Sequence, residues 1–291
     1  MTGVQTCALP ISYLPFRFLV LAPGSFKDDS ENQRSFEALQ RISTRLKLRM
    51  SYRENIGMGS IESVIDESGS KFDFVLGLSS QVLPSLIDIA TKHPNVKSAF
   101  IGHYPGNFGN LGAVAFQPSH HYLVGVIAGL KTKTGRVGAL IGNEEPLSVE
   151  EINAFNEGVR RVNPEVICYT TNIGGKHDKR AAFSGAASML KNKVDVLFVN
   201  CGAAGNDLYK WGELNKVMMI GSVEDQYSKA PGWVLTSVIT NYDKIFNHAI
   251  EQMLKGQWQG GFYRFGTAEK ATDIASDRKS TRLNSSHGKL S

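Results

Sequence analysis

The stretch FLVLAPGSFKDDSENQRSFEAL, Phe18 to Leu39, decides the fold class of this chain of 291 residues. Its first five residues are all apolar, which predicts a buried strand. Phe36, Leu39, Ile42 and Leu46 then recur at helical spacing, so a helix is expected after the polar loop. A strand that passes through a loop into a helix is the repeating unit of an α/β fold.

The same alternation continues along the rest of the chain. Apolar segments predict strands at 18–22, 48–52, 74–77, 98–101, 113–116, 137–141, 166–170, 194–200, 216–221 and 234–240. Helices fit between most of them, at 32–45, 59–67, 84–93, 120–130, 149–162, 179–191, 208–215 and 243–254. This order predicts parallel sheets with right-handed crossovers.

Both ends of the sequence are unlike the rest. MTGVQTCALPI at 1–11 and DRKSTRLNSSH at 277–287 resemble translations of a sequencing-library adapter, so we expect residues 1–12 and 277–291 to be non-native tails. The second tail carries four basic residues and one acidic residue, and removing this net +3 from the formal charge of +5 leaves +2. A nearly neutral chain gives no reason to expect nucleic acid as a partner.

The remaining length predicts two lobes. About 265 residues exceed what one hydrophobic core organises comfortably. We expect two Rossmann-like lobes with parallel sheets, joined by a multi-strand hinge: lobe 1 at 13–131, completed by about 236–256, and lobe 2 at 132–235, with about 257–276 as an optional completion. Several crossings between lobes make a hinge with a cleft. No apolar run approaches the length that spans a bilayer.

The loop after the first strand is the first candidate site. In open α/β sheets, ligands bind in the crevice beyond the carboxyl ends of the strands. Asp28, Ser30 and Asn32 are expected at that edge, beside the start of the helix. The alternative is that Asp28 and Ser30 only cap the helix, and the sequence leaves both interpretations open.

Other motifs favour binding over catalysis. CGAAGND at 201–207, which includes Gly202, lacks the Lys-Ser/Thr ending of a phosphate-binding loop and is either a cleft loop or a tight turn. GLSSQ, with Ser79, has Gln81 where a nucleophile elbow needs Gly. The acidic loop with Asp225 either accepts hydrogen bonds from sugar hydroxyls or is a solvated turn. No cysteine spacing indicates a zinc site, and Cys168 and Cys201 are expected as buried strand residues.

Taken together, these segments resemble the basic membrane protein family, the PnrA-like substrate-binding lipoproteins of ABC importers. GSFKDDSENQRSFEAL at 24–39 is similar to the family's first-turn pattern. DFVLGLSS at 73–80, the region 90–97, GVIAGLKTKTGRVG at 125–138 and the segment 220–243 are similar to later patterns in the same order. The similarity covers nearly the whole chain between the tails.

The resemblance implies a type I periplasmic-binding fold that closes on a small molecule, usually a purine nucleoside, and delivers it to an ABC permease. It implies a monomer that needs no cofactor. It also implies a location outside the cytoplasm, in the cell envelope, where only an N-terminal lipid anchor, missing from this sequence, would hold the protein to the membrane. Asp28 and Asn32 match base-contacting positions, and Asp225 matches an acidic cleft position. A Med-like regulatory or sensory protein on the same fold, with altered or lost ligand binding, is the alternative.

Several positions depart from the family pattern. Glu31 stands where an aromatic residue is expected, Val223 replaces an acidic residue, and Thr240 replaces a lysine. A nucleoside-like or other small polar ligand is therefore expected, with aromatic residues such as Phe26 or Tyr104 as replacement stacking surfaces. The expected ligand-binding set, which includes no catalytic residue and no metal ligand, is Phe26, Asp28, Ser30, Asn32, Ser79, Tyr104, Gly202, Asp225 and Thr240.

Overall fold

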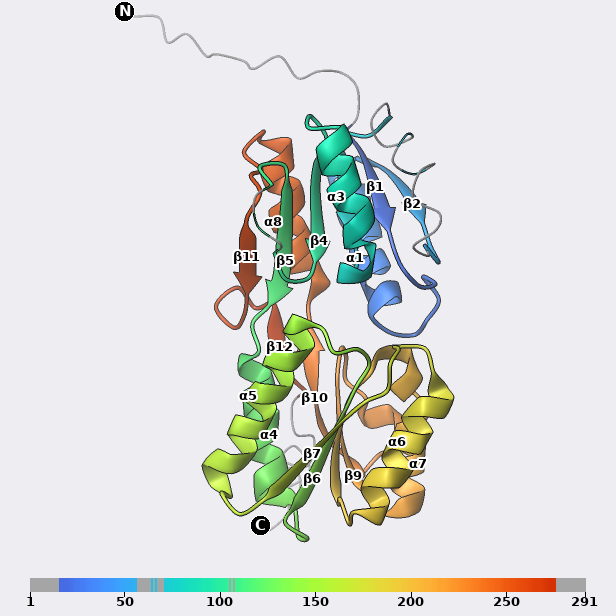
Figure 1. The fold of residues 1–291 in the computed structure, drawn as a ribbon, viewed down its shortest axis with the longest axis vertical. Coiled ribbons are helices and arrows are strands. Elements are labelled where there is room, and N and C mark those ends of the chain that lie inside the picture. Colours follow the sequence, from blue (N-terminus) through green and yellow to red (C-terminus); the bar gives the residue numbers. More distant parts are fainter. Residues whose placement is uncertain are drawn as a thin grey trace, which may run out of the picture.

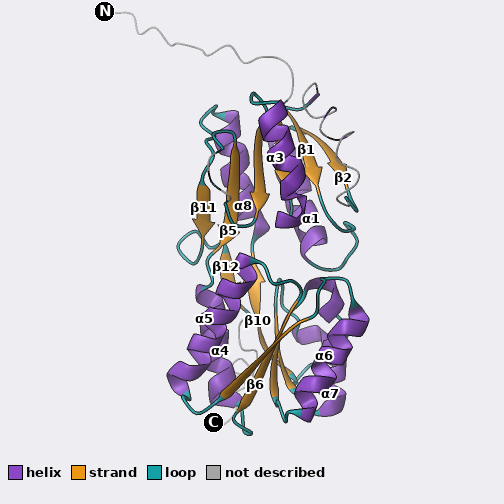
Figure 2. Ribbon diagram, in the orientation of Figure 1, coloured by secondary structure: helices purple, strands orange, loops and turns teal. Residues whose placement is uncertain are grey.

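The structure is a computed structural model that describes residues 16–56, 64, 66, 71–104, 106 and 108–275. These residues form two lobes stacked along the long axis of the molecule (Figure 1). Each lobe contains one six-stranded sheet, and helices flank both sheets (Figure 2). The expected tails, and most of the helix expected at 59–67, lie outside the described residues.

Lobe 1 is built on a parallel sheet with the strand order β11-β5-β4-β3-β1-β2. Its strands are β1 (Arg17–Leu21), β2 (Arg49–Arg53), β3 (Phe74–Gly77), β4 (Lys97–Ile101), β5 (Leu111–Phe116) and β11 (Phe262–Phe265). Its helices are α1 (Glu31–Leu46), α3 (Leu83–Lys92) and α8 (Tyr242–Leu254), with the short 3-10 helix η1 (Ser80–Val82) before α3.

Strand β1 shows why an all-apolar segment is needed at the centre of this sheet. Phe18 and Val20 belong to the core on the side of α1 and α8, whereas Leu19 and Leu21 belong to the core on the side of α3. All four side chains are fully buried. Successive side chains of a strand point to opposite faces, so a strand covered on both faces has no position left for a polar residue.

Lobe 2 has the sheet order β12-β10-β9-β8-β6-β7. Its strands are β6 (Arg136–Ile141), β7 (Ile167–Asn172), β8 (Val196–Asn200), β9 (Met218–Gly221), β10 (Val234–Thr240) and β12 (Thr272–Ile274), of which β12 alone pairs antiparallel, with β10. Its helices are α4 (Ser119–Lys131), α5 (Pro146–Val162), α6 (Lys179–Lys191) and α7 (Leu208–Asn215), with 3-10 helices η2 (Gly202–Gly205) and η3 (Tyr227–Lys229).

The backbones of helices α4 and α5 are in contact. Each helix has a glycine at the point of contact, Gly125 in α4 and Gly158 in α5. A Cβ at Gly125 would lie 2.1 Å from the carbonyl oxygen of Phe155, and a Cβ at Gly158 would lie 2.0 Å from that of Tyr122. Real side chains do not tolerate such distances, so any larger residue would push the helices apart. This contact places α4 in lobe 2.

The lobe boundaries differ from the expected ones. Helix α4 lies within the range assigned to lobe 1, yet it packs on α5, β10 and β12 of lobe 2. Most of strand β10 lies in the range 236–256, which is expected to complete lobe 1, but β10 pairs with β9 of lobe 2. Within that range, only α8 belongs to lobe 1, where it packs on α1. The segment 257–276 is shared, since β11 joins the first sheet and β12 the second. The expected boundaries differ because the lobe to which a segment belongs depends on strand pairing and helix packing, and the sequence pattern does not show these contacts.

Three connections therefore cross between the lobes in the described chain: β5 to α4, β10 to α8, and β11 to β12. They are tied to one another by backbone hydrogen bonds, in which Gln117 donates to Phe265 and Asn241 donates to Ala271, each at 2.8 Å. Two α/β lobes joined by a multi-strand hinge confirm the expected fold class. Cys168 lies in β7 and is half-buried, Cys201 directly follows β8 and is buried, and both are free thiols.

Candidate ligand-binding cleft

A cavity of about 90 Å³ lies between the two lobes. It is bounded by residues at or beyond the carboxyl ends of strands in both sheets, among them Ser79 after β3, Phe116 at the end of β5 and Ser222 after β9. This is the edge at which α/β sheets bind ligands, because loops and helix starts converge there without interrupting the core. A solute in this cavity contacts both lobes at once.

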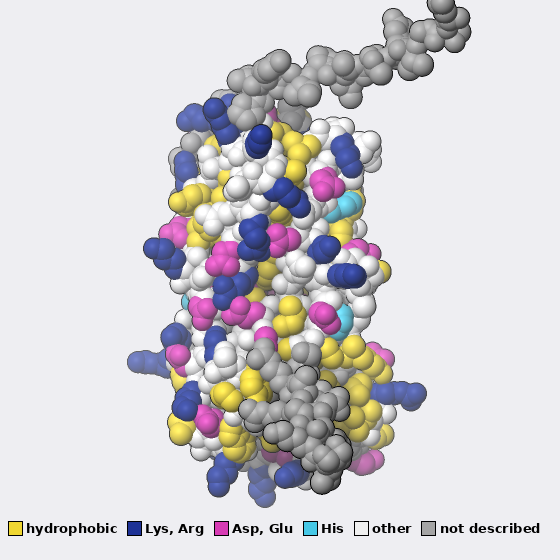
Figure 3. Space-filling view, turned by 180° about the vertical axis from the view of Figure 1, so that it is seen from behind, with side chains coloured by type: hydrophobic (Ala, Val, Ile, Leu, Met, Phe, Trp, Pro, Cys, Tyr) yellow, Lys and Arg dark blue, Asp and Glu magenta, His cyan; other side chains and the backbone are white. Residues whose placement is uncertain are grey.

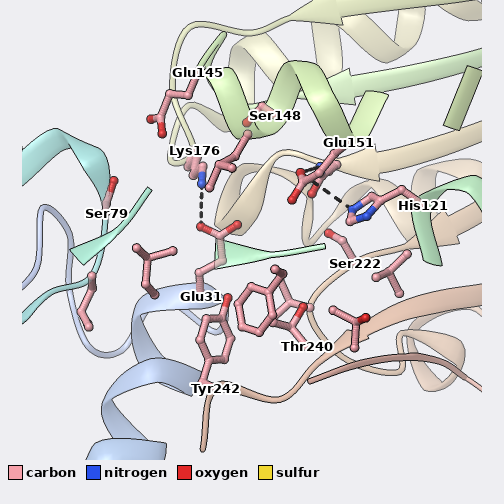
Figure 4. Close-up of a pocket in the computed structure, with 18 residues that line it drawn as sticks. Glu31, Ser79, His121, Glu145, Ser148, Glu151, Lys176, Ser222, Thr240 and Tyr242 are labelled. Atoms are coloured by element: carbon pink, nitrogen blue, oxygen red, sulfur yellow. Dashed lines mark hydrogen bonds and ion pairs between the residues drawn. The ribbon is translucent and has the colours of Figure 1, made fainter. Parts of the chain in front are cut away.

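Charged side chains dominate the polar part of the cavity wall (Figure 4). Glu31 lies in the first turn of α1, Glu145 and Glu151 lie at the start of α5, and Lys176 lies in the loop between β7 and α6. The apolar part of the wall includes an edge-to-face pair of aromatic rings, Phe116 and Tyr242, whose centroids are 5.4 Å apart.

Lys176 crosses the cleft to pair with Glu31. Its Nζ lies 2.8 Å from Oε2 of Glu31, and the two side chains are 26% and 29% exposed. Burial by itself would lower the pKa of Lys176, but Glu31, with Glu145 and Glu151 further away, raises that pKa well above its ordinary value. The ammonium group therefore stays protonated, and it links the two lobes.

Gly202 allows Lys176 to take this position. Its backbone has φ of +59°, in the left-handed region that favours glycine. A Cβ at this residue would also come within 2.9 Å of Cβ of Lys176. The backbone of Lys176 is fixed by the same loop, because its carbonyl oxygen accepts a hydrogen bond from the N–H of Ala204 at 2.8 Å.

Glu151 and His121 form the second polar group of the wall. Oε2 of Glu151 accepts a hydrogen bond from the Asn200 side chain at 2.8 Å and lies 3.8 Å from Nε2 of His121 (Figure 4). Burial lowers the pKa of His121 despite the nearby Glu151 carboxylate, so the ring is neutral near pH 7. Its Nδ1 is buried and has no hydrogen-bond partner among the described residues.

Further contacts join the lobes around the cavity. Nη2 of Arg34 lies 2.9 Å from Oε1 of Glu224, Nη2 of Arg264 lies 2.5 Å from Oε2 of Glu150, and the Ser80 hydroxyl donates to Glu145. Acidic and basic side chains are interspersed over the middle of the rear face (Figure 3). The cleft is therefore closed, and complementary charges hold it closed.

Two of the nine expected site residues line this cavity, Ser79 and Thr240. Asp28 lies beside it and caps α1 instead: its carboxylate accepts hydrogen bonds from the N–H groups of Ser30 and Gln33, each at 3.0 Å, and from the Asn32 side chain at 2.9 Å. This is the capping alternative that the sequence left open. Ser30 and Asn32 are buried beside Asp28, outside the cavity lining.

The other expected residues also lie outside the lining. The ring of Phe26 is buried in lobe 1 and stacks on Phe36 at 4.1 Å. The Tyr104 hydroxyl donates a hydrogen bond to the Phe108 carbonyl oxygen at 2.8 Å. Asp225 accepts one from the N–H of Tyr227 at 3.0 Å, at the start of η3. Their role in ligand binding stays a prediction, as does that of Asp28 and Asn32.

The sequence reasoning did not select Glu31, His121, Glu145, Glu151 or Lys176. A signal existed for some of them, because Glu145 and Lys176 closely follow the ends of two neighbouring parallel strands, where ligand-binding loops are expected. Glu31 was visible as the departure from an expected aromatic residue. His121 and Glu151 gave no such signal, since each lies within a helix.

No group of three or more His, Cys, Asp or Glu side chains in the described part of the chain is arranged to hold a metal ion. Over the same residues, no helix has both the length and the apolar character needed to cross a membrane.

The fold and the cleft define a two-lobe α/β protein with a cavity between its lobes. The chain belongs to the family described as ABC transporter substrate-binding protein PnrA-like, whose model matches residues 17–288. The family resemblance seen in the sequence is thereby confirmed. The matched range extends into the segment that was expected to be a non-native tail.

Individual relatives agree with this assignment. The chain is 25% identical over 254 residues to the CD4+ T-cell-stimulating antigen of Listeria monocytogenes, which covers 81% of this chain and 69% of the relative. It is 25% identical over 255 residues to basic membrane protein A of Borreliella burgdorferi, covering 83% and 74%.

Solved structures share the fold. An ABC transporter solute-binding protein from Aeropyrum pernix K1 superposes with a TM-score of 0.80 at 21% identity, covering 95% of this chain and 81% of that one. A transcriptional activator of the comK gene from Bacillus halodurans superposes with a TM-score of 0.74 at 16% identity, covering 94% and 95%.

Proposed function

We propose that this chain binds a small polar solute between its lobes and delivers it to an ABC permease. The cavity that both lobes line carries this proposal. A solute that contacts both lobes stabilises the closed form over the open one, and a permease that distinguishes the two forms responds to the bound solute. Membership of a substrate-binding family supports the same role.

A nucleoside is not the ligand that the closed cleft fits best. Sites for ligands of drug size usually measure roughly 300–1,000 Å³, whereas this cavity measures about 90 Å³. Asp28 and Asn32, which match base-contacting positions of the family, are bonded to each other and to the start of α1. We therefore favour a smaller polar solute, and a nucleoside requires the lobes to separate further.

The proposed role is binding without catalysis. Nucleophilic catalysis by serine needs a neighbouring base that accepts the hydroxyl proton. At this cleft the Ser222 hydroxyl donates to the carbonyl oxygen of Val199 at 2.9 Å, and a backbone carbonyl is not such a base. This contact suits a serine that shapes the wall rather than one that attacks a substrate.

The remaining parts of the proposal follow from the family. We infer that the protein works as a monomer on the outer side of the cytoplasmic membrane, where a solute-binding protein meets its permease, and that a lipid anchor holds it there. No cofactor is needed for a role that consists of binding and release.

One observation favours a second function. The Lys176 and Glu31 pair joins the two lobes through side chains of the protein itself. A regulatory or sensory protein that has lost ligand binding would keep its lobes together by such an internal contact. The likeness to the comK activator shows only a shared fold, so the ion pair is the observation that supports this alternative.

Calorimetric titration of the purified chain separates the two functions. The solute panel contains nucleosides, monosaccharides, amino acids and small amines, and each positive result is repeated by thermal shift. Under the transport proposal, one class gives saturable heat with one site per chain and raises the melting temperature. If no class gives heat and none shifts the melting temperature, the transport proposal fails and the regulatory function stands.

A further inference from the structure

The walls of the cleft carry an excess of negative charge. Among the residues that line the cavity, Glu31, Glu145 and Glu151 are acidic, Lys176 is basic, and His121 is a buried histidine. With His121 neutral, the formal charge of the lining is therefore −2, since three carboxylates face one ammonium group. Such a cavity attracts cations and repels anions, more strongly than an exposed surface does, because partly buried charges are poorly screened.

Several hydrogen-bond donors at the cavity already bond to acidic or backbone acceptors of the protein. Lys176 donates to Glu31 and the side chain of Asn200 donates to Glu151, each at 2.8 Å. The Ser222 hydroxyl donates to a backbone carbonyl, and beside the cavity the Ser80 hydroxyl donates to Glu145. Each carboxylate has about four lone-pair sites, so the three carboxylates of the wall keep spare acceptors. A solute that supplies donors therefore finds charged acceptors here.

A second and independent observation is the unpartnered ring nitrogen Nδ1 of His121. The residue is 5% exposed, it lines the cavity, and its Nδ1 has no hydrogen-bond partner in the part of the chain that the structure describes. Figure 4 shows its ring inside the cavity beside Glu151. In the tautomer whose Nε2–H faces the Glu151 carboxylate, Nδ1 carries a lone pair. A buried polar atom normally has a partner, and here a donor from a ligand would supply it.

We propose, building on the proposed solute-binding function, that the solute is a small organic cation with an ammonium group. Neutral polyols also donate hydrogen bonds, but they gain nothing from the net charge of the wall. A bound metal ion is disfavoured, because no three His, Cys, Asp or Glu side chains of the described residues are grouped to hold one. The rings of Phe116 and Tyr242 add aromatic surface, which attracts ammonium groups.

The size of the cavity fits the same class. A volume of about 90 Å³ is several times the roughly 10–15 Å³ that one water molecule needs on this measure. This suffices for an ammonium group with a short carbon chain. A second amine at the far end of the ligand would find one of the remaining carboxylates, so a diamine is expected to bind more tightly than a monoamine.

The test compares four probes on the full chain by calorimetric titration: ethanolamine, 1,4-diaminobutane, ribose and adenosine. We expect the two amines to bind, the diamine more tightly, and ribose and adenosine to give no heat. If ribose or adenosine binds and the amines do not, the cation inference is wrong while the solute-binding proposal survives. Equal binding of amines and neutral probes also overturns it. If no probe binds, the cation inference is wrong, and the wider panel decides the proposed function.

Variants locate the binding site. Glu151→Gln keeps the shape of the side chain and removes its charge, so amine affinity is expected to fall about tenfold or more. Glu157→Gln is the matched control, because Glu157 lies on the same helix and is exposed; it should change affinity less than about twofold. Glu145→Gln is a second test if Glu151→Gln does not fold. Unchanged amine affinity in a folded Glu151→Gln or Glu145→Gln protein would overturn the assignment.

Discussion

Replacing Lys176 by Met is predicted to open the cleft. At 2.8 Å, two unit charges attract by about 6 kcal/mol at an effective dielectric constant of about 20. Desolvation of both ions offsets most of this attraction. The side chains of Lys176 and Glu31 are also 26% and 29% exposed, so solvent screens the pair in part. A net contribution of about 1–3 kcal/mol to closure remains. Its loss should shift the equilibrium between closed and open forms toward the open form by about five- to 150-fold.

Small-angle X-ray scattering measures this shift directly, since separating the lobes of an elongated molecule increases its radius of gyration. Lys179→Met is the control, because Lys179 forms an ion pair of the same 2.8 Å length with Asp207, but within lobe 2 and with both side chains more than half exposed. We expect a larger radius for Lys176→Met and the wild-type radius for Lys179→Met. Superimposable scattering curves for all three proteins would refute the role of Lys176 in closure.

Three further predictions concern stability. Asp28→Asn should lower the free energy of unfolding by about 1 kcal/mol in urea titrations. Burial opposes it, but the His177 side chain and the capping N–H groups together lower the pKa of Asp28, so this difference should disappear as the pH falls below the ordinary value of 3.8. Burial lowers the pKa of His121, so the stability that the neutral ring contributes is complete above its ordinary value of 6.5 and is lost at lower pH. Wild type should therefore lose stability as the pH falls below 6.5 more steeply than His121→Gln. Gly158→Ala should cost about 2 kcal/mol and lower the melting temperature, whereas Gly109→Ala, whose Cβ would meet no atom within 4 Å, should not.

Most of the fold could be predicted from local pattern. Strand β3, FVLG, is apolar and buried throughout, and it begins and ends at the residues that the sequence predicts. Strand β10 also has the predicted bounds, because its β-branched and apolar residues outnumber its polar ones. The same holds for helices α6 and α7, each with a clear amphipathic pattern. By contrast, β11 was not predicted, because its four residues are mostly half-buried and include an arginine. Strand β12 has three residues and is set by its pairing with β10.

The candidate site was less predictable than the fold. Ser79 and Thr240 could be placed because they closely follow or end predicted strands. The pairing of Lys176 with Glu31 depends on how the two lobes are oriented, and no local pattern in either segment encodes that orientation. Asp28 was expected in the cleft because family position and capping chemistry favour the same residue type at the start of α1.

The cap and the cleft are nevertheless linked through a single turn of helix. Asp28 accepts hydrogen bonds from the first N–H groups of α1, and this fixes where the helix begins. Glu31 is the first residue of that helix, so its carboxylate is held where Lys176 reaches it across the cleft. A carboxylate in the first turn is also favoured by the helix dipole, which an aromatic residue would not exploit. Glu31 in place of an aromatic residue thus puts a fixed negative charge where a stacking surface is expected, and the proposed preference for cations over flat neutral rings rests on this charge.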